Sequence, residues 1–162
     1  MIDLNREIYY VQNPAIAAII LWKFVCGYYE KNNQEAPLPL LFIVLPIVFR
    51  EDLRGVIQST NKISGLQKIS EKLFKDKKRD LFCDIQRSAD QYRFLTLSAI
   101  NIAVGANLVN ICPKTALVEP VITKLNEKKK LTSTLVKQAE KLGVWCSQLS
   151  LHEISMLLKV RF

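Results

Sequence analysis

Hydrophobic positions along the chain fall into runs that predict a mainly helical protein. Asn13 and Pro14 are typical of a helix start, because an Asn side chain accepts hydrogen bonds from free backbone amides and Pro loses no bond at the first helical position. The expected helix continues to about Glu30, and within residues 15–26 only Lys23 is charged. A helix with so few polar positions buries most of its circumference.

Residues 38–49, LPLLFIVLPIVF, are almost entirely apolar and raise three alternatives. A membrane-spanning helix requires roughly 20 apolar residues, whereas this run is shorter and is followed directly by Arg50. A central β-strand is disfavoured because Pro46 cannot donate a ladder hydrogen bond. We therefore expect one or two helices that continue into the sequence REDLRGVIQ and are kinked or broken near Pro46.

Further helices are predicted in the middle of the chain. A short helix begins at Gly65 or Leu66, with Ser64 as its candidate cap. After the basic sequence KDKKRD, small and apolar side chains recur at steps of three and four, which is the spacing of a helix stripe that faces a core. This helix is either continuous or broken near Thr96. Its stripe consists of Phe82, Ile85, Ala89, Tyr92, Thr96, Ala99 and Ala103, and Leu95 and Ile102 widen it.

The segments NLVNIC and TALVEPVI predict a β-hairpin, because both are short, contain β-branched residues and are separated by Pro113 and Lys114. A helix followed by a two-stranded hairpin is the layout of a winged helix-turn-helix. We therefore expect a mainly α fold, a helical domain with a small β-hairpin that is winged-helix-like. The 162 residues fit one compact domain, 1–162, or two lobes, 1–65 and 66–162, that share a core.

A basic linker, residues 124–131, and two C-terminal helices complete the predicted elements. The first of these helices is amphipathic, with an apolar stripe at helical spacing. Ser150 and Glu153 then match a capping box, in which each side chain bonds the backbone amide of the other residue, and a last short helix starts there. The apolar Phe162 indicates that the end of the sequence is docked, on the body of the protein or on a partner. The stripe of the amphipathic helix consists of Leu135, Ala139, Leu142, Cys146 and Leu149.

The formal net charge of +8 is concentrated in two short segments. Residues 62–79 contain seven bases and two acids, and residues 124–141 contain six bases and two acids, so the rest of the chain sums to −1. Such clusters fit an acidic partner, either nucleic acid or an acidic protein surface, and solvated helix faces and linkers show the same pattern. The candidate contacts with DNA or an acidic partner are Lys75, Lys77, Lys78, Arg79, Lys128, Lys129 and Lys130.

The residues that usually support catalysis are missing together, so we expect a protein that is not an enzyme and uses no cofactor. His152, the only histidine, lies inside the capping box, where a structural role is expected. No pair of the four cysteines has the spacing of a zinc or redox motif, and the sequence contains neither a Walker phosphate loop nor a dinucleotide-binding glycine pattern. The cysteines are expected to act as small apolar residues in a reducing compartment.

The N-terminal sequence MIDLNREIYYVQ does not fit a secretory signal, because it contains Asp3 and Glu7 and has no apolar core. The predicted helix over residues 132–149 matches a membrane-surface helix only loosely, and core packing explains its apolar stripe equally well. We therefore expect a cytoplasmic protein with no membrane partner.

Four segments, in this order, resemble the middle component of the bacterial three-component ABC systems: NPAIAAIILWKFVCGYY, PLPLLFIVLPIVF, STNKISGL and QLSLHEISMLLKVRF. The resemblance covers about residues 10–160. The best-described members of this group are Lamassu-type antiphage defence systems. The resemblance implies a small, helix-rich, winged-helix-like subunit that accompanies an SMC-like ABC ATPase, itself expected to be a dimer, and an effector, often a nuclease. It implies no catalytic residues.

Two functions remain open at this point. Under the resemblance, the chain is a non-catalytic adaptor that bridges a DNA-sensing ATPase to the effector and helps keep the effector inactive until foreign DNA is sensed. The alternative is a stand-alone winged-helix DNA-binding regulator. Its recognition helix would contain LTLSAINIAVGAN, which has no Arg or Lys between Thr96 and Asn107 and is therefore a poor surface for reading base edges. The expected partner contacts of the adaptor are Leu151, Ile154, Leu158, Arg161 and Phe162.

Overall fold

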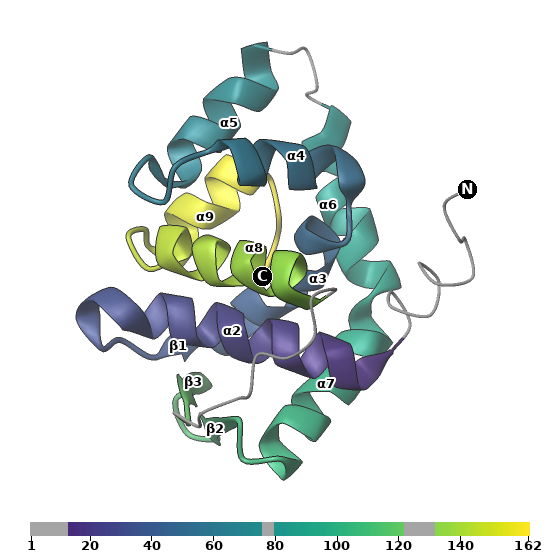
Figure 1. Ribbon diagram of the computed structural model, residues 1–162, viewed down its shortest axis with the longest axis vertical. Helices are drawn as coiled ribbons and strands as arrows, with labels where there is room; N and C mark the ends of the chain where they lie inside the picture. The colour runs from purple at the N-terminus through teal and green to yellow at the C-terminus, as the bar shows by residue number, and fades with distance from the viewer. Residues whose placement is uncertain (1–12, 76–79, 122–131) are drawn as a thin grey trace.

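The structure, a computed structural model, describes residues 13–75, 80–121 and 132–162. The predicted mainly α fold with a small β-hairpin is confirmed (Figure 1). In chain order the elements are α2 (Pro14–Asn32), β1 (Ala36–Pro37), the 3₁₀ helix η1 (Leu38–Leu40), α3 (Leu41–Val48), α4 (Glu51–Ser59), α5 (Gly65–Lys75), α6 (Asp80–Gln91), α7 (Arg93–Gly105), β2 (Val109–Cys112), β3 (Leu117–Pro120), α8 (Thr132–Cys146) and α9 (Leu151–Leu158).

Helix α2 is the central element of the fold. It starts where the sequence predicts, because the Asn13 side chain accepts hydrogen bonds from the backbone amides of Ala15 (2.9 Å) and Ile16 (3.4 Å). It ends at Asn33, whose left-handed backbone (φ 50°) lets its amide bond the Tyr29 carbonyl. Its most extensive contacts are with α8 and α7, which lie on different sides of it (Figure 1).

The crossing of α2 and α8 depends on two glycines. A Cβ atom at Gly27 would overlap the backbone carbonyl of Glu140 in α8, and a Cβ atom at Gly143 would overlap the carbonyl of Phe24 in α2. The two backbones are therefore in direct contact, with no side chain between them. This close approach buries Trp145 and Phe24 completely on either side of the crossing.

The apolar run 38–49 forms η1 and α3, as the helical alternative predicts. Seven of the eight residues of α3 are buried, so the run is part of the core. Pro46 lies inside α3. The helix continues past it to Val48, with Phe49 as its C-cap, and Arg50 then adopts an extended backbone before α4. Pro46 therefore removes one amide from the helix without ending it. In the described part of the chain, no helix has both the length and the apolar character needed to cross a membrane.

The long apolar stripe is divided between two helices. The break lies at Tyr92, whose backbone (φ −86°, ψ 2°) leaves the helical region, and the ring of Tyr92 packs 5.7 Å from that of Phe49. The predicted stripe members Ile85, Thr96, Ala99 and Ala103 are buried, as expected. Ile102 is 38% exposed, and the prediction that it widens the buried stripe is wrong.

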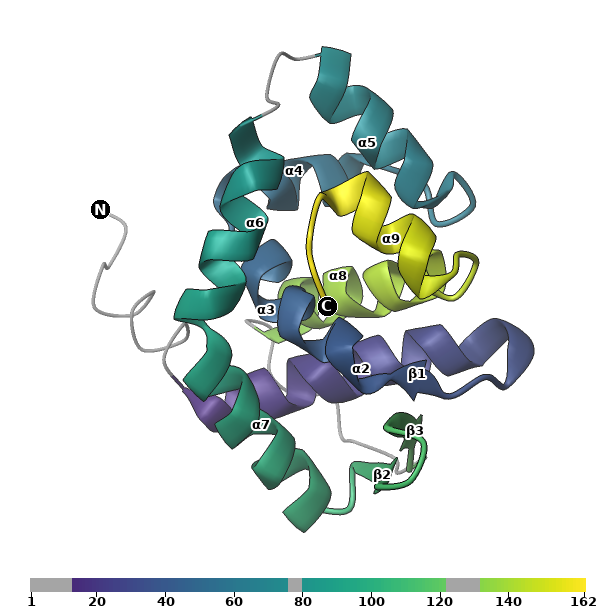
Figure 2. The ribbon, with the colours of Figure 1, turned by 180° about the vertical axis from the view of Figure 1, so that it is seen from behind.

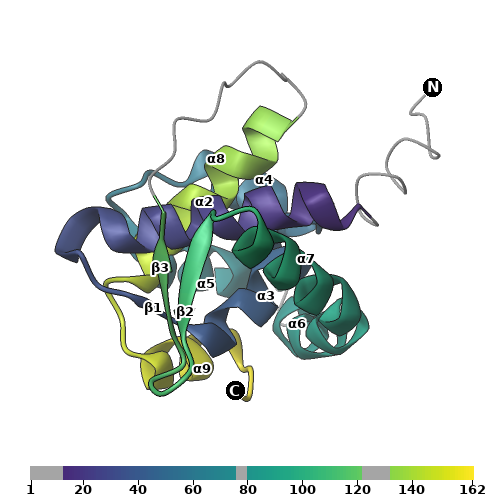
Figure 3. The same cartoon turned by 90° about the horizontal axis from the view of Figure 1, so that it is seen from below.

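A third strand accompanies the predicted hairpin. Strand β3 pairs with β2 on one side and with β1 on the other, both antiparallel, so the order is β1-β3-β2. Figure 3 shows the three strands side by side next to α2. The indole nitrogen of Trp22 in α2 donates to the Val121 carbonyl (3.2 Å), which fixes the end of the hairpin on the central helix.

The C-terminal elements also follow the prediction. The capping box is present, with the Glu153 amide donating to the Ser150 hydroxyl (3.2 Å) and the Ser150 amide donating to the Glu153 carboxylate (2.7 Å). After α9, Val160 is buried and the Arg161 amide donates to the Gln86 side chain of α6 (2.9 Å). The last residues therefore pack on the body of the protein, beside α6 (Figure 2).

Candidate interaction surfaces

The basic contacts predicted from the sequence are only partly described by the structure. Lys75 is exposed and is the last residue of α5. The other members, Lys77, Lys78, Arg79, Lys128, Lys129 and Lys130, lie outside the described residues. Their contact with DNA or an acidic partner stays a prediction.

Two other lysines of the basic segments donate hydrogen bonds inside the fold. The Lys141 ammonium donates to the carbonyls of Ile57 (3.1 Å) and Thr60 (2.8 Å), and Lys72 donates to the Thr60 hydroxyl (3.0 Å) and the Ser59 carbonyl (3.4 Å). Both cations thus sit at the C-terminal end of α4, where the helix dipole is negative. Burial, followed by the nearby charge of Lys72, lowers the pKa of Lys141.

Other lysines of the first basic segment are paired with acids. Lys62 lies 2.8 Å from Glu30 and 3.8 Å from Glu140, and Lys68 lies 3.2 Å from Glu71. The backbone carbonyl of Lys62 also accepts a hydrogen bond from the Trp145 indole (2.9 Å). Part of the sequence-level charge excess is therefore used in ion pairs and helix capping, and is less available to a partner than the count of bases indicates.

The predicted partner contacts at the C-terminus differ in exposure. Ile154 and Leu158 are 0% and 3% exposed and belong to the core of this chain, because α9 turns its apolar face inward. Leu151 is half-buried, whereas Arg161 is exposed and Phe162 is 45% exposed. Of the five, only Arg161 and Phe162 are exposed, and their contact with a partner stays a prediction.

Among the described residues, the largest group of exposed large apolar side chains lies on α7, where the sequence predicts only the recognition helix of the alternative regulator. Phe94 is 81% exposed, and Leu97 and Val104 are each 42% exposed. The predicted core stripe does not include Phe94, Leu97 and Val104. Apolar residues off the stripe are the sequence signal that could have revealed a second apolar face. Helix α7 forms one end of the molecule, at the bottom of Figures 1 and 2.

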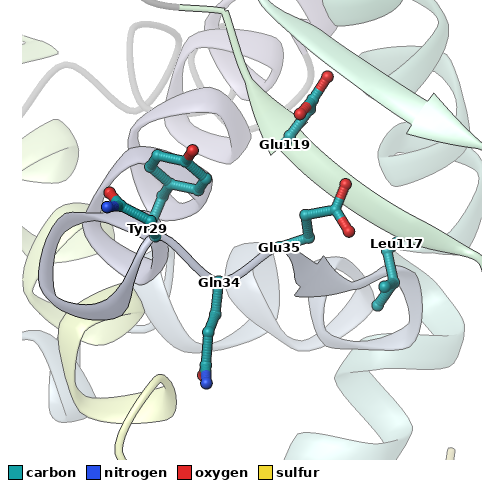
Figure 4. Close-up of a pocket in the computed structure, with 6 residues that line it drawn as sticks. Tyr29, Gln34, Glu35, Leu117 and Glu119 are labelled. Carbon is teal, nitrogen blue, oxygen red and sulfur yellow. The ribbon is translucent and has the colours of Figure 1, made fainter.

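A small acidic cavity of about 490 Å³ lies between the end of α2 and the sheet. Glu35 precedes β1 and Glu119 is part of β3, and Figure 4 shows both carboxylates together with Tyr29 among the lining residues. Glu119 accepts a hydrogen bond from the Asn110 side chain (3.2 Å). The cavity is open and its lining is mainly polar, which suits a solvated surface depression.

The described cysteines occupy different environments. Burial raises the pKa of the Cys26 thiol to about 11 and that of the Cys146 thiol to about 12, so both stay protonated at neutral pH. Hydrogen bonding with Thr115, in the hairpin turn, lowers the pKa of Cys112. Among the described residues, no three His, Cys, Asp or Glu side chains are grouped closely enough to hold a metal ion.

Comparison with known proteins identifies the family of this chain. No curated protein and no solved structure is significantly similar to it. Residues 1–162 match the family described as ABC-three component (ABC-3C) system Middle Component 3. The match extends over the whole length of the sequence, and the general resemblance to middle components of three-component ABC systems is thereby confirmed. The chain belongs to the family of Middle Component 3 proteins of ABC-three component systems.

Proposed function

We propose that this protein is a non-catalytic adaptor that bridges an SMC-like ABC ATPase to an effector, in a Lamassu-type system for antiviral defence. The observation that carries the proposal is membership, over residues 1–162, in a family of middle components, because such a component implies partner components. In this role the protein helps keep the effector, a nuclease, inactive until the ATPase dimer senses foreign DNA in the cytoplasm.

The surface of the molecule supports an adaptor in preference to a stand-alone DNA-binding regulator. In a winged-helix layout the helix directly before the hairpin is the recognition helix, and the helix at that point of this chain is α7. Base readout requires side chains that donate or accept hydrogen bonds. The outer face of α7 instead carries Phe94, Leu97 and Val104, which favours contact with protein.

Direct contact with DNA remains part of the proposal for the basic segments. Lys75 is exposed at the end of α5, immediately before the predicted contacts Lys77, Lys78 and Arg79. Lysine and arginine side chains bind phosphates without reading sequence. An acidic coiled coil of the ATPase would present the same chemistry as a phosphate backbone, and salt dependence with each partner separates the two.

Co-expression with the neighbouring open reading frames tests the adaptor role. The full chain is purified through an affinity tag and analysed by native mass spectrometry. A defined complex that contains a large ATPase and a second subunit would support the proposal. A lone monomer or homodimer that binds DNA in a salt-dependent manner would favour the regulator. The purified complex, assayed with and without this chain, also tests whether the chain restrains the effector and has no activity of its own.

A further inference from the structure

The outer face of α7 carries a row of exposed side chains that is apolar except for one asparagine. Phe94, Leu97, Asn101 and Val104 follow one another at steps of three, four and three, so they share one side of the helix. All four are exposed, with Phe94 at 81%. Ile102 is 38% exposed and lies on another side of α7, since one residue step from Asn101 is about 100° around the helix. Of seven large apolar side chains that are exposed among the described residues, four belong to this one helix.

The inner face of the same helix is already occupied. Thr96, Ala99, Ile100 and Ala103 are buried, and α7 packs along α2 (Figure 2). These residues lie about half a turn away from the exposed set, since an α-helix has about 3.6 residues per turn. The apolar outer face is therefore not explained by the packing of the described residues.

The surface carries little charge. Residues 94–112 contain no Asp, Glu, Lys or Arg, although 23% of the whole chain is charged. On α7 a phosphate backbone would meet one cation, the exposed Arg93 at the start of the helix, so nucleic acid is a poor occupant. The central cores of protein interfaces are depleted of charged residues in the same way.

The size of the surface argues for a helix and against a second copy of the chain. The exposed parts of its three apolar side chains amount to on the order of 300 Å², which is the size of a functional patch on a monomer. A stable protein dimer needs about 800 Å² from each partner. A single amphipathic helix that places apolar residues at steps of three and four matches a stripe of this length.

We propose that the outer face of α7 is the docking surface for an amphipathic helix of a partner component, whose contacting side is apolar and uncharged. This inference rests on the proposed adaptor function and assigns a surface to it. Phe94 is the main anchor, because it is the largest and most exposed side chain of the face, and aromatic side chains are enriched at interface cores. Leu97 and Val104 extend the contact along the helix.

The first test removes the apolar side chains. The triple variant Phe94→Gln, Leu97→Gln, Val104→Gln keeps good helix formers on α7. The matched control is Ile63→Gln, Met156→Gln, at side chains that are 91% and 68% exposed on other elements. With the full chain and the co-expressed components, we expect the triple variant to bind the partner at least about tenfold more weakly and the control to bind like wild type.

The second test places a charge in the middle of the face. Asn101→Lys and Asn101→Glu both put a charge against an apolar partner, so both are expected to weaken binding to the co-expressed components. If nucleic acid were the occupant, Asn101→Glu would weaken its binding and Asn101→Lys would strengthen it. Opposite responses of the two variants would therefore overturn the proposal, as would a wild-type response of both.

The outcomes also separate the docking surface from the adaptor role. If wild type recovers no partner component, the adaptor function fails and the docking proposal fails with it. If wild type and the triple variant recover the complex equally, the adaptor function stands and the α7 docking surface is wrong. A homodimer of wild type that dissociates in the triple variant would identify a second copy as the occupant and would also overturn the proposal. Thermal unfolding of every variant confirms that a loss of binding is not a loss of fold.

Discussion

Helices α2 and α7 are similar in sequence and different in the structure. Residues 15–26 of α2 contain one charge, and residues 94–105 of α7 contain none. Within residues 15–26 of α2, seven of the twelve side chains are buried, because α3, α7, α8 and the sheet all contact the helix. In α7 only four side chains are buried, and large apolar side chains face outward. An uncharged, apolar helix is thus a core element in one place and an exposed surface in another, and only the packing of its neighbours distinguishes the two.

The most direct test of this difference in burial is to truncate one phenylalanine on each helix. Phe24 is 0% exposed and Phe94 is 81% exposed. We expect Phe24→Ala to lower the free energy of unfolding by about 3–5 kcal/mol, because it leaves a cavity in the core. Phe94→Ala should change it by no more than about 0.5 kcal/mol. Urea unfolding of the two variants measures both, and equal losses would show that Phe94 is covered within the monomer.

The next largest effect is expected at the helix crossing. Gly143→Ala places a methyl group against the backbone of α2, where no flexible side chain can move away. We expect a loss of about 2–3 kcal/mol in the free energy of unfolding. Gly105→Ala on α7 is the matched control, because no atom lies within 4 Å of its added Cβ. The control should be neutral or gain about 0.5 kcal/mol from helix propensity, and a neutral Gly143→Ala would mean that the two helices are further apart.

A smaller effect is expected when the pH is raised from 8 to 10. Cys146 is 0% exposed and burial raises the pKa of its thiol from 9.0 to about 12. The folded state therefore holds a proton that the unfolded state loses above pH 9, so the stability from this group is complete below pH 9 and falls as the pH rises. The expected slope is about 1.4 kcal/mol per pH unit between pH 9 and pH 12.

Denaturant unfolding at pH 8, 9 and 10 measures the slope, and Cys146→Ala is the comparison variant. The raised pKa of Tyr28 adds to the loss near pH 10 and above, whereas the lowered pKa of Lys141 acts in the opposite direction. In Cys146→Ala, the free energy of unfolding should fall less steeply with pH than in wild type, and the difference is the contribution of the Cys146 thiol. An identical slope in the two proteins would show that Cys146 does not titrate on unfolding.

Features that depend on neighbours in the sequence could be predicted. The Asn13 cap of α2, the capping box at Ser150 and the β2–β3 hairpin each need only a few adjacent residues, and all three are present. The identification of residues 38–49 as a core helix region also follows from composition and length. Local signals of this kind are short-range, so a sequence contains them completely.

Features that depend on distant residues could not be predicted. Strand β1 has two residues and pairs with Val118 and Leu117, far along the chain. Lys141 caps α4 across a separation of more than 80 residues, although its place in a basic segment predicts an exposed charge. The exposure of the outer side of α7 could not be predicted either, because it depends on which distant elements cover it. The stripe pattern identifies one buried face and cannot show whether a second face is also covered.

The smallest change in stability is expected from reversing charges in the basic linker. The triple variant Lys128→Glu, Lys129→Glu, Lys130→Glu should leave the free energy of unfolding nearly unchanged, because three consecutive lysines are almost never buried. The same variant should weaken binding to DNA or an acidic component of the complex, and wild-type binding should weaken with added salt. The matched control is Lys31→Glu, Lys114→Glu, Lys159→Glu, at three exposed lysines, since it alters the net charge equally.

Salt dependence then separates the two surfaces. Binding through the uncharged face of α7 should be nearly insensitive to ionic strength, whereas binding through Lys128–Lys130 should fall steeply with it. If the linker variant binds every partner and DNA as wild type does, the linker is only a solvated connector. If the linker and control variants lose binding equally, the effect comes from net charge. A loss confined to the linker variant, together with salt-insensitive binding at α7, would show that the protein holds two partners by different physical means.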